Sequence, residues 1–332
     1  MRRQHSDSTG LRRDARRTAA CASNDKNCGE RCKAPVRRGA RQGGYQDRSI
    51  ADMTNWLITG ISGGLGRELA RAALDRGDQV FGTSRSEASC AEFEQLAPGS
   101  AYAGVLDFSD ESAPARIFAM AEGAMGPVDI LVNNAGYGVI GAIEEVSSAE
   151  MRALFDVNVF GAIAMIQAAL PSMRERQAGH IVNITSVSGL APWAGTAIYG
   201  ASKYALECIG QTLAQEVGPM GIKVTNVAPG GMRTNFAGGS LRLAEQDIAA
   251  YAQTAHFAKQ SLISGQGKEK GDPKRAARAI IDTLGMDEPP MHLLLGDDAL
   301  HYAEGQIELL QREMERWKEY STSIAFPETA DA

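Results

Sequence analysis

A tyrosine and a lysine four residues apart, Tyr199 and Lys203, form a pair of side chains that could transfer a proton. On one helix such residues share a face, about 6 Å apart along the axis. Free tyrosine has a pKa near 10, and an adjacent ammonium should lower it. The phenol could then exchange a proton with a carbonyl or alcohol oxygen near neutral pH. The alternative is an ordinary half-buried tyrosine beside a solvated lysine.

Four further motifs accompany this pair, three of them at the end of an apolar run and one inside a helical stretch. Ser186 ends NITS and lies 13 residues before Tyr199, where its hydroxyl could bond to a substrate oxygen. Asn158 lies in VNVFG, inside a long helical stretch. The other two motifs are NNAG at 133–136 and APGGMRT at 228–234.

Seven short apolar runs predict the strands that position these motifs: 56–60, 79–84, 101–107, 129–136, 179–186, 222–230 and 291–296. Helical stretches alternate with them at 64–76, 111–124, 148–173, 197–218 and 273–285. This alternation predicts an α/β fold, a Rossmann-type doubly wound parallel sheet of about seven strands with helices on both faces. Residues 231–272 break the rhythm and are interpreted as a mobile lid, and 297–320 as a C-terminal helix.

The turn after the first strand, TGISGGLG, predicts a site for a dinucleotide pyrophosphate. Its glycines permit positive φ and close backbone approach, and the following helix points its N–H groups at the anion. The alternative is a tight glycine-rich turn without a ligand. The candidate contacts in this turn are Gly60, Ser62, Gly64, Leu65 and Gly66.

The end of the second strand indicates which nucleotide is preferred. Sites for NAD(H) usually carry a carboxylate there, but this chain has Ser84 and Arg85. A guanidinium suits a 2′-phosphate, so NADP(H) is predicted to be preferred, with NAD(H) possible. Arg85 could also be a solvated loop charge. Asp107, at the end of the third strand, could bond to the adenine or cap the next helix.

Taken together, the glycine turn, NNAG, Asn158, Ser186, YxxxK and PG resemble the short-chain dehydrogenase/reductase family from residue 54 to about 300. The start MTNWLITG and the C-terminal helix look like the bacterial members grouped with hydroxysteroid dehydrogenases. The resemblance implies that Ser186, Tyr199, Lys203 and Asn158 form a catalytic tetrad, with Tyr199 as general acid/base and Lys203 also on the ribose hydroxyls. It also implies nucleotide contacts at Asn133, Ala135, Gly136, Pro229, Gly230 and Thr234.

The substrate class follows from the residues expected near this tetrad, which are mostly apolar or aromatic: Tyr137, Val139, Trp193, Met232 and Phe236. They predict a lipophilic ketone, aldehyde or alcohol. One alternative is a 3-oxoacyl-thioester reductase, whose carrier would dock on Lys268, Lys270, Lys274 and Arg275. A non-enzyme alternative is an NADP-sensing regulator, a class that tends to lack the tyrosine and lysine.

Charge and cysteine content bear on the chain's organisation, partners and compartment. Residues 1–52 carry 11 Arg and 2 Lys against 6 acidic residues, so this +7 segment leaves −13 on 53–332 of a chain with net charge −6. We interpret 1–52 as a disordered basic extension with the natural start at Met53, and 53–332 as one oxidoreductase domain.

An acidic body excludes nucleic acid as the main partner. Without a long apolar run or a cysteine framework, we expect a cytoplasmic protein with no membrane partner. The family resemblance implies a homodimer or homotetramer.

Overall fold

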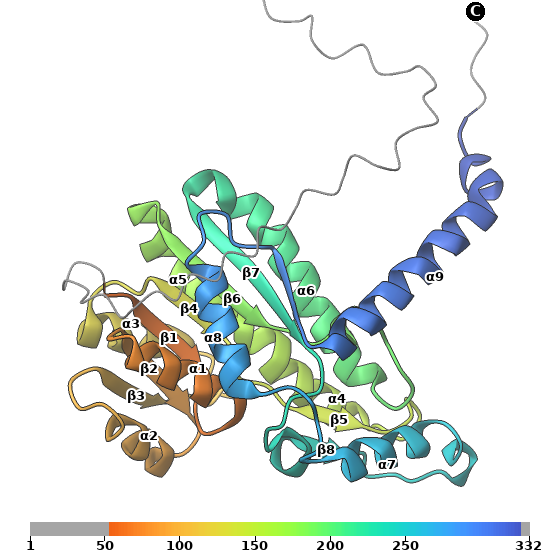
Figure 1. The fold of residues 1–332 in the computed structure, drawn as a ribbon, viewed down its shortest axis with the longest axis horizontal. Helices are drawn as coiled ribbons and strands as arrows, with labels where there is room; N and C mark the ends of the chain where they lie inside the picture. Colours follow the sequence, from red (N-terminus) through yellow and green to blue (C-terminus); the bar gives the residue numbers. More distant parts are fainter. Residues whose placement is uncertain (1–52, 327–332) are drawn as a thin grey trace, which may run out of the picture. The chain divides into compact units, whose positions relative to one another are not determined.

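The computed structural model describes residues 53–326, so the predictions for residues 1–52 lie outside the described part of the chain. Within residues 53–326, seven parallel strands form one sheet in the order β3-β2-β1-β4-β6-β7-β9 (Figure 1). The order reverses direction beside β1, and sheets of this kind bind ligands outside the carboxyl ends of the strands at that point. The strands are β1 (Asn55–Thr59), β2 (Gln79–Ser84), β3 (Ala101–Val105), β4 (Ile130–Asn133), β6 (Gly179–Ile184), β7 (Ile222–Pro229) and β9 (His292–Leu295).

Helices cover both faces of this sheet, as its apolar strands require. One face packs on α1 and α8 in a core that includes Trp56, Leu69 and Ile280. The other packs on α3, α5 and α6 around Leu131, Met165 and Ile181. The helices are α1 (Gly64–Asp75), α2 (Glu87–Glu94), α3 (Ala113–Met125), α4 (Ser148–Phe155), α5 (Ala162–Arg176), α6 (Ala197–Val217), α7 (Ala255–Gly265), α8 (Pro273–Leu284) and α9 (Asp297–Thr322).

All seven predicted strands and all five predicted helical stretches are present, so the doubly wound fold is confirmed. The short helix α2 was missed, because its eight residues have almost no apolar periodicity. The segment 231–272 contains α7 and a strand β8 (Leu241–Leu243) that pairs with β5 (Gly138–Ile140). This small second sheet joins the predicted lid to the body and was not predicted.

One helical stretch, Ser148–Arg176, is long and apolar enough to cross a membrane by length and composition. It is the continuous run of α4, a π-helical turn at Asp156–Gly161, and α5. Met165, Ala169 and Met173 on this stretch are fully buried in the core under the sheet. Burial of this kind is also what a core helix of a globular domain shows, so the stretch is weak evidence for a membrane span.

Candidate active site

Tyr199 and Lys203 lie one turn apart on α6, as the sequence predicts. The Lys203 Nζ lies 5.9 Å from the centroid of the Tyr199 ring. Lys203 is only 5% exposed, and its Nζ donates a 2.8 Å hydrogen bond to the backbone oxygen of Ile184 at the end of β6. A buried ammonium is therefore held at the carboxyl edge of the sheet, beside the phenol.

The pKa values of this pair are set mainly by burial. Burial lowers the pKa of Lys203 to about 8, and the nearby Glu207 carboxylate opposes that change. Burial raises the pKa of Tyr199, while a hydrogen bond with the Ser186 side chain acts in the opposite direction. Burial therefore outweighs any lowering of the Tyr199 pKa in this structure, and the net shift is opposite to the one expected beside an ammonium. A raised pKa keeps the phenol protonated at neutral pH, the form that donates to a carbonyl oxygen.

Asn158 lies in the π-helical turn between α4 and α5, and three hydrogen bonds fix its side chain. Its Oδ1 accepts from Tyr137 N at 3.0 Å, and its Nδ2 donates to Tyr137 O at 2.9 Å and to the Ser202 Oγ at 3.0 Å. Single π-turns of this kind occur frequently at functional sites. The side chain is 1% exposed, so it links the strand-end loop after β4 to α6 from within the core.

Gly136 shows how closely these groups converge. A Cβ placed on Gly136 would lie 3.0 Å from Asn158 Oδ1 and 3.5 Å from Lys203 Nζ. The end of NNAG therefore lies against both members of the predicted proton path. Asn158, Ser186, Tyr199 and Lys203 thus come from three separate segments of the chain and meet at one edge of the sheet.

The glycine turn has the backbone that was predicted for a pyrophosphate site. Gly60 and Gly64 have φ values of +78° and +60°, and α1 begins at Gly64 without a side-chain cap on its first amides. A Cβ on Gly66 would lie 2.2 Å from Asn134 Nδ2. Ser62 is exposed at the turn, whereas Leu65 is buried in the core and offers only its backbone.

Asn134 was not predicted, although it belongs to the quoted NNAG motif. Its Nδ2 donates to Thr59 O at 2.8 Å and to Gly60 O at 2.9 Å, and the Thr59 hydroxyl accepts from Asn134 N and Ala135 N. These bonds tie the glycine turn to the loop after β4. The sequence signal for Asn134 was a second polar residue at the end of an apolar strand, because a side-chain amide at a buried strand end needs hydrogen-bond partners.

The residues predicted to contact the adenosine end lie along the ends of β2 and β3. Ser84 is buried, and its Oγ accepts from Ser86 N at 3.2 Å. Arg85 is exposed and makes no ion pair within the described residues. A backbone hydrogen bond from Ser109 lowers the pKa of Asp107, and its carboxylate closes a local turn with Ser109. The N-cap of α3 is Ser112, so Asp107 does not cap that helix.

A buried row of amides starts at Asn133. Asn133, Asn183 and Asn226 are paired in register on β4, β6 and β7, and each Nδ2 donates at 3.0 Å or less to the next acceptor in the row. The row ends on the Glu207 carboxylate, which also accepts from the Thr185 hydroxyl at 2.5 Å. Asn133 Oδ1, at the β4 end of the row, is buried without a hydrogen-bond partner within residues 53–326.

The loop after β7 is held by a residue that was not predicted. Asp298, at the start of α9, accepts a 2.7 Å hydrogen bond from Gly231 N, and a Cβ on Gly230 would lie 2.2 Å from its Oδ1. Pro229 ends β7. Thr234 lies beside the glycine turn, because a Cβ on Gly64 would be 3.7 Å from the Thr234 Cβ. Sequence spacing gave no signal for Asp298, which is distant in the chain.

The predicted substrate residues divide into two groups. The Phe236 ring centroid lies 5.9 Å from that of Tyr199, so Phe236 is beside the reactive phenol. Trp193 is 40% exposed and contacts the Tyr302 ring of α9 at 5.7 Å. Val139 and Met232 instead pack into hydrophobic clusters. Burial raises the pKa of Tyr137, whose ring lies 4.6 Å from the Arg242 guanidinium.

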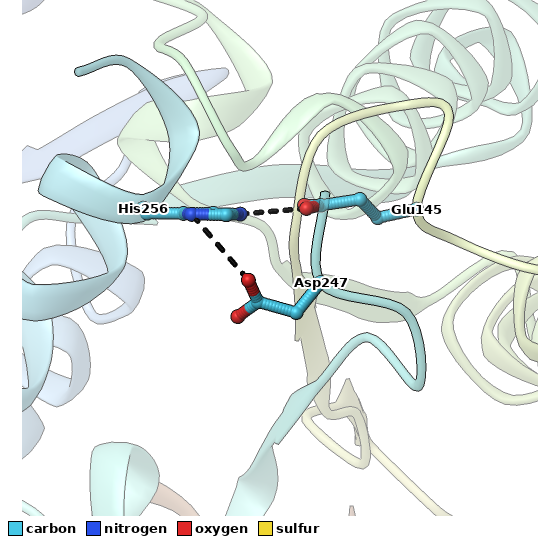
Figure 2. A group of neighbouring side chains, drawn as sticks. All are labelled: Glu145, Asp247 and His256. Atoms are coloured by element: carbon cyan, nitrogen blue, oxygen red, sulfur yellow. Dashed lines mark hydrogen bonds and ion pairs between the residues drawn. The ribbon is translucent and has the colours of Figure 1, made fainter. Parts of the chain in front are cut away.

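A cluster of Glu145, Asp247 and His256 anchors the segment 231–272 to the body (Figure 2). His256 Nε2 lies 2.6 Å from Glu145 Oε1, while its Nδ1 lies 3.8 Å from Asp247 Oδ1. Each ring nitrogen faces one carboxylate, and one possible ligand atom from each of the three residues lies within 4.8 Å of the others. The cluster is therefore a hydrogen-bonded and charged clamp. Buried Glu145 also accepts from Ile248 N at 2.7 Å.

The basic residues proposed for carrier docking are exposed but do not form a uniform patch. Lys268, Lys270, Lys274 and Arg275 all face solvent. Glu269 and Asp272 lie among them, and Lys268 donates to the backbone oxygen of Ser264 at 3.1 Å. Nothing in this arrangement favours the thioester alternative over the main prediction.

The family model for short chain dehydrogenases matches residues 54–242, and the chain belongs to that family. The chain is 33% identical over 271 residues to oxidoreductase BOA17 of Botryotinia fuckeliana, covering 81% of this chain and 98% of that protein. It is 34% identical over 255 residues to retinol dehydrogenase 8 of Bos taurus, covering 71% and 79% of the two chains. The sequence resemblance is thereby confirmed.

Solved structures of similar proteins support the same family assignment. A short-chain dehydrogenase from Streptomyces avermitilis superposes with a TM-score of 0.79 at 38% identity, covering 83% of this chain and all of the other. A serine dehydrogenase in complex with NADP+ superposes with a TM-score of 0.63 at 25% identity, covering 72% and 93%. The glycine turn, the uncapped start of α1 and the unpaired Asn133 Oδ1 fit a nicotinamide dinucleotide in this chain. The protein is an oxidoreductase of the nicotinamide-dependent kind.

Proposed function

We propose that this protein interconverts a lipophilic ketone or aldehyde and the corresponding alcohol, with NADP(H) as the preferred cofactor and Tyr199 as general acid/base. The observation that carries the proposal is the convergence of Ser186, Tyr199, Lys203 and Asn158 beside the glycine turn. The nicotinamide, when bound, supplies or accepts the hydride. The side chains of this chain have the remaining tasks of orientation and proton transfer.

In the reducing direction, Tyr199 donates its phenolic proton to the carbonyl oxygen, and the hydrogen bond with Ser186 aims the phenol at that position. The Lys203 ammonium, held at Ile184 O, stabilises the phenolate that remains. Asn158 holds the loop after β4 against Lys203, which keeps a route for reprotonation in place. The oxidising direction runs these steps in reverse.

The preference for NADP(H) rests on charge at the end of β2. Arg85 is exposed and forms no ion pair within 4 Å among the described residues, so its guanidinium is available to a 2′-phosphate. The last residue of β2 is Ser84, a neutral side chain, where an NAD-specific site would carry a carboxylate.

The lipophilic substrate class rests on Phe236 beside Tyr199 and on the exposed face of Trp193. The name retinol dehydrogenase 8, carried by a relative 34% identical to this chain, specifies a lipophilic alcohol. A 3-ketodihydrosphingosine reductase from Bacteroides thetaiotaomicron, 30% identical, also has a long-chain lipid in its name. Both relatives point to the same physical class of substrate, an apolar chain or ring bearing one oxygen.

The test is Tyr199→Phe, which removes the proton donor and leaves the ring. Turnover of a panel of lipophilic carbonyls should fall by about 10²–10⁴, while NADPH binding, followed by fluorescence, stays within about twofold because the ring is retained. Tyr204→Phe is the matched control, since Tyr204 lies on the same helix but donates to Leu190 O. If Tyr199→Phe kept normal turnover, the assignment of the acid/base would be wrong.

A further inference from the structure

The C-terminal helix α9 exposes large apolar side chains along most of its length. Leu300, Ile307, Leu310, Met314 and Trp317 are each between 48% and 64% exposed. Only its first turns pack on the body, where Ala299 and Ala303 are buried. The helix α9 extends away from the sheet in Figure 1.

The free part of α9 has no packing partner among the described residues, and every residue from Glu308 to Thr322 is exposed. Helices owe most of their stability in proteins to packing of an apolar face, and isolated helices of this length are marginal in water. Such a long exposed apolar face on a folded domain indicates an interaction surface.

The apolar positions follow a heptad pattern. Leu300, Ala303, Ile307, Leu310, Met314 and Trp317 are spaced three and four residues apart in strict alternation, whereas Leu309 and Tyr320 fall outside it. Ala303 is buried, so the exposed seam consists of Ile307, Leu310, Met314 and Trp317. This is the a/d spacing of a two-stranded left-handed coiled coil, with Ile307 at an a position and Leu310 at a d position, the combination that favours two parallel strands. An ordinary surface helix packed on its own domain has a wider apolar stripe without strict alternation.

The residues flanking this seam are complementary to a second copy of the same helix. With Ile307 at position a, Glu313 falls at g and Lys318 at the following e. In a parallel pair, g of one helix faces the next e of the other, so Glu313 would meet the second copy's Lys318 on both sides of the seam. Gln306 and Gln311 would pair in the same way.

The charge of α9 argues against a lipid surface as the occupant. The helix has seven acidic and three basic residues. Helices that lie on anionic membranes are rich in Lys and Arg on their polar face. A surface of net charge −4 would be repelled by such a membrane, whereas a second copy of α9 brings its own matching Lys318.

We propose that the exposed seam of α9 pairs with α9 of a second copy of this chain as a short parallel coiled coil. The pairing would act near the site, because the base of α9 contacts it at two points. Asp298 accepts from Gly231 N in the loop after β7, and Tyr302 contacts Trp193. Fixing α9 in a pair would therefore fix one wall of the substrate region.

Site-specific cross-linking of the full chain tests the contact independently of any other interface. In Met314→Cys, two copies of the new cysteine face each other in a parallel pair, so mild oxidation should give a 314–314 disulfide, identified by mass spectrometry. Leu309→Cys is the matched control, because Leu309 is also exposed on α9 but lies outside the seam. Equal cross-linking at both positions, or none at 314, would overturn the proposal.

A charge exchange adds a second readout. Lys318→Glu should reduce the yield of the 314–314 disulfide several-fold, because it places a second carboxylate opposite Glu313, and adding Glu313→Lys should restore it. If the yield of the 314–314 disulfide stayed low in the double variant, the charge pair would have no role.

The lipid alternative is tested with vesicles of phosphatidylcholine and phosphatidylserine. Sedimentation of the full chain with them that is lost in Leu310→Glu would assign the seam to a membrane and overturn the proposal.

Discussion

The site has a body side, formed by the strand ends and α6, and a lid side, formed by residues 231–272. The two sides are held in different ways. On the body side, Asn158 and Lys203 are at most 5% exposed, and each is bonded to backbone at a strand end or its loop. On the lid side, within 231–272, large apolar residues such as Phe257 and Ile263 are 65% and 43% exposed. The difference indicates that the groups proposed to transfer the proton are preorganised, while the segment proposed to cover the substrate depends on a few anchors and can change shape.

The largest effect should follow from loosening the body side. Asn158→Ala would remove the bonds to Tyr137 N, Tyr137 O and Ser202 at once, so the loop after β4 and Lys203 would lose their common support. Because small displacements of positioned groups cost about 10² in rate, we expect kcat to fall about 10²–10³-fold. Steady-state kinetics with thermal denaturation as a folding check would measure this.

Ser202→Ala is the graded comparison, because it removes only one of those bonds. Its kcat should fall by less than that of Asn158→Ala. If Asn158→Ala were folded and fully active, the body side would not be the preorganised half of the site.

The second effect concerns Arg85, a body-side residue whose side chain is exposed to solvent. Arg85→Ala should raise the KM for NADPH by about 10–100-fold, the value of one or two charge-assisted hydrogen bonds, and leave the KM for NADH unchanged. Arg152→Ala removes an exposed charge elsewhere on the body and should change neither constant. Equal effects on both nucleotides would exclude a role for Arg85 in 2′-phosphate recognition.

The sequence predicted the body side well because its motifs end strands, and parallel strands bring their carboxyl ends to one edge. The strand-end position of Ser186, the helical spacing of Tyr199 and Lys203, and the family resemblance together placed these three residues at one site. The contacts of Asp298 and Glu145 could not be predicted. Each of them bonds to the backbone of a loop that is distant in the sequence and has no hydrophobic periodicity. The direction of the Tyr199 pKa shift also failed, because burial of the phenol cannot be read from spacing.

The third effect is a shift in pH dependence. Glu207 raises the pKa of Lys203 against burial, so Glu207→Gln should lower that pKa below its present value of about 8. The protonated form of Lys203 supports the phenolate, so activity is lost as pH rises through the pKa of Lys203, and the basic limb should move to lower pH. Rates at pH 7 should fall by at most about tenfold.

The matched control for Glu207 is Glu216→Gln, which removes an exposed carboxylate from the same helix. Its pH–rate profile should superimpose on that of the unchanged protein. If the basic limb of Glu207→Gln stayed in place while thermal stability fell, Glu207 would serve only to pair the buried amides.

The smallest effect should come from the lid. His256→Asn would break the 2.6 Å contact with Glu145 and release one anchor of residues 247–256, while the proton-transfer groups stay bonded as before. We therefore expect the KM for the carbonyl substrate to rise a few-fold with kcat nearly unchanged, and amides near Ile248 to exchange hydrogen faster. His301→Asn, on the exposed start of α9, is the control. A fall in kcat as large as that of Asn158→Ala would show that the lid is part of the preorganised machinery, and the two sides of the site would no longer differ in kind.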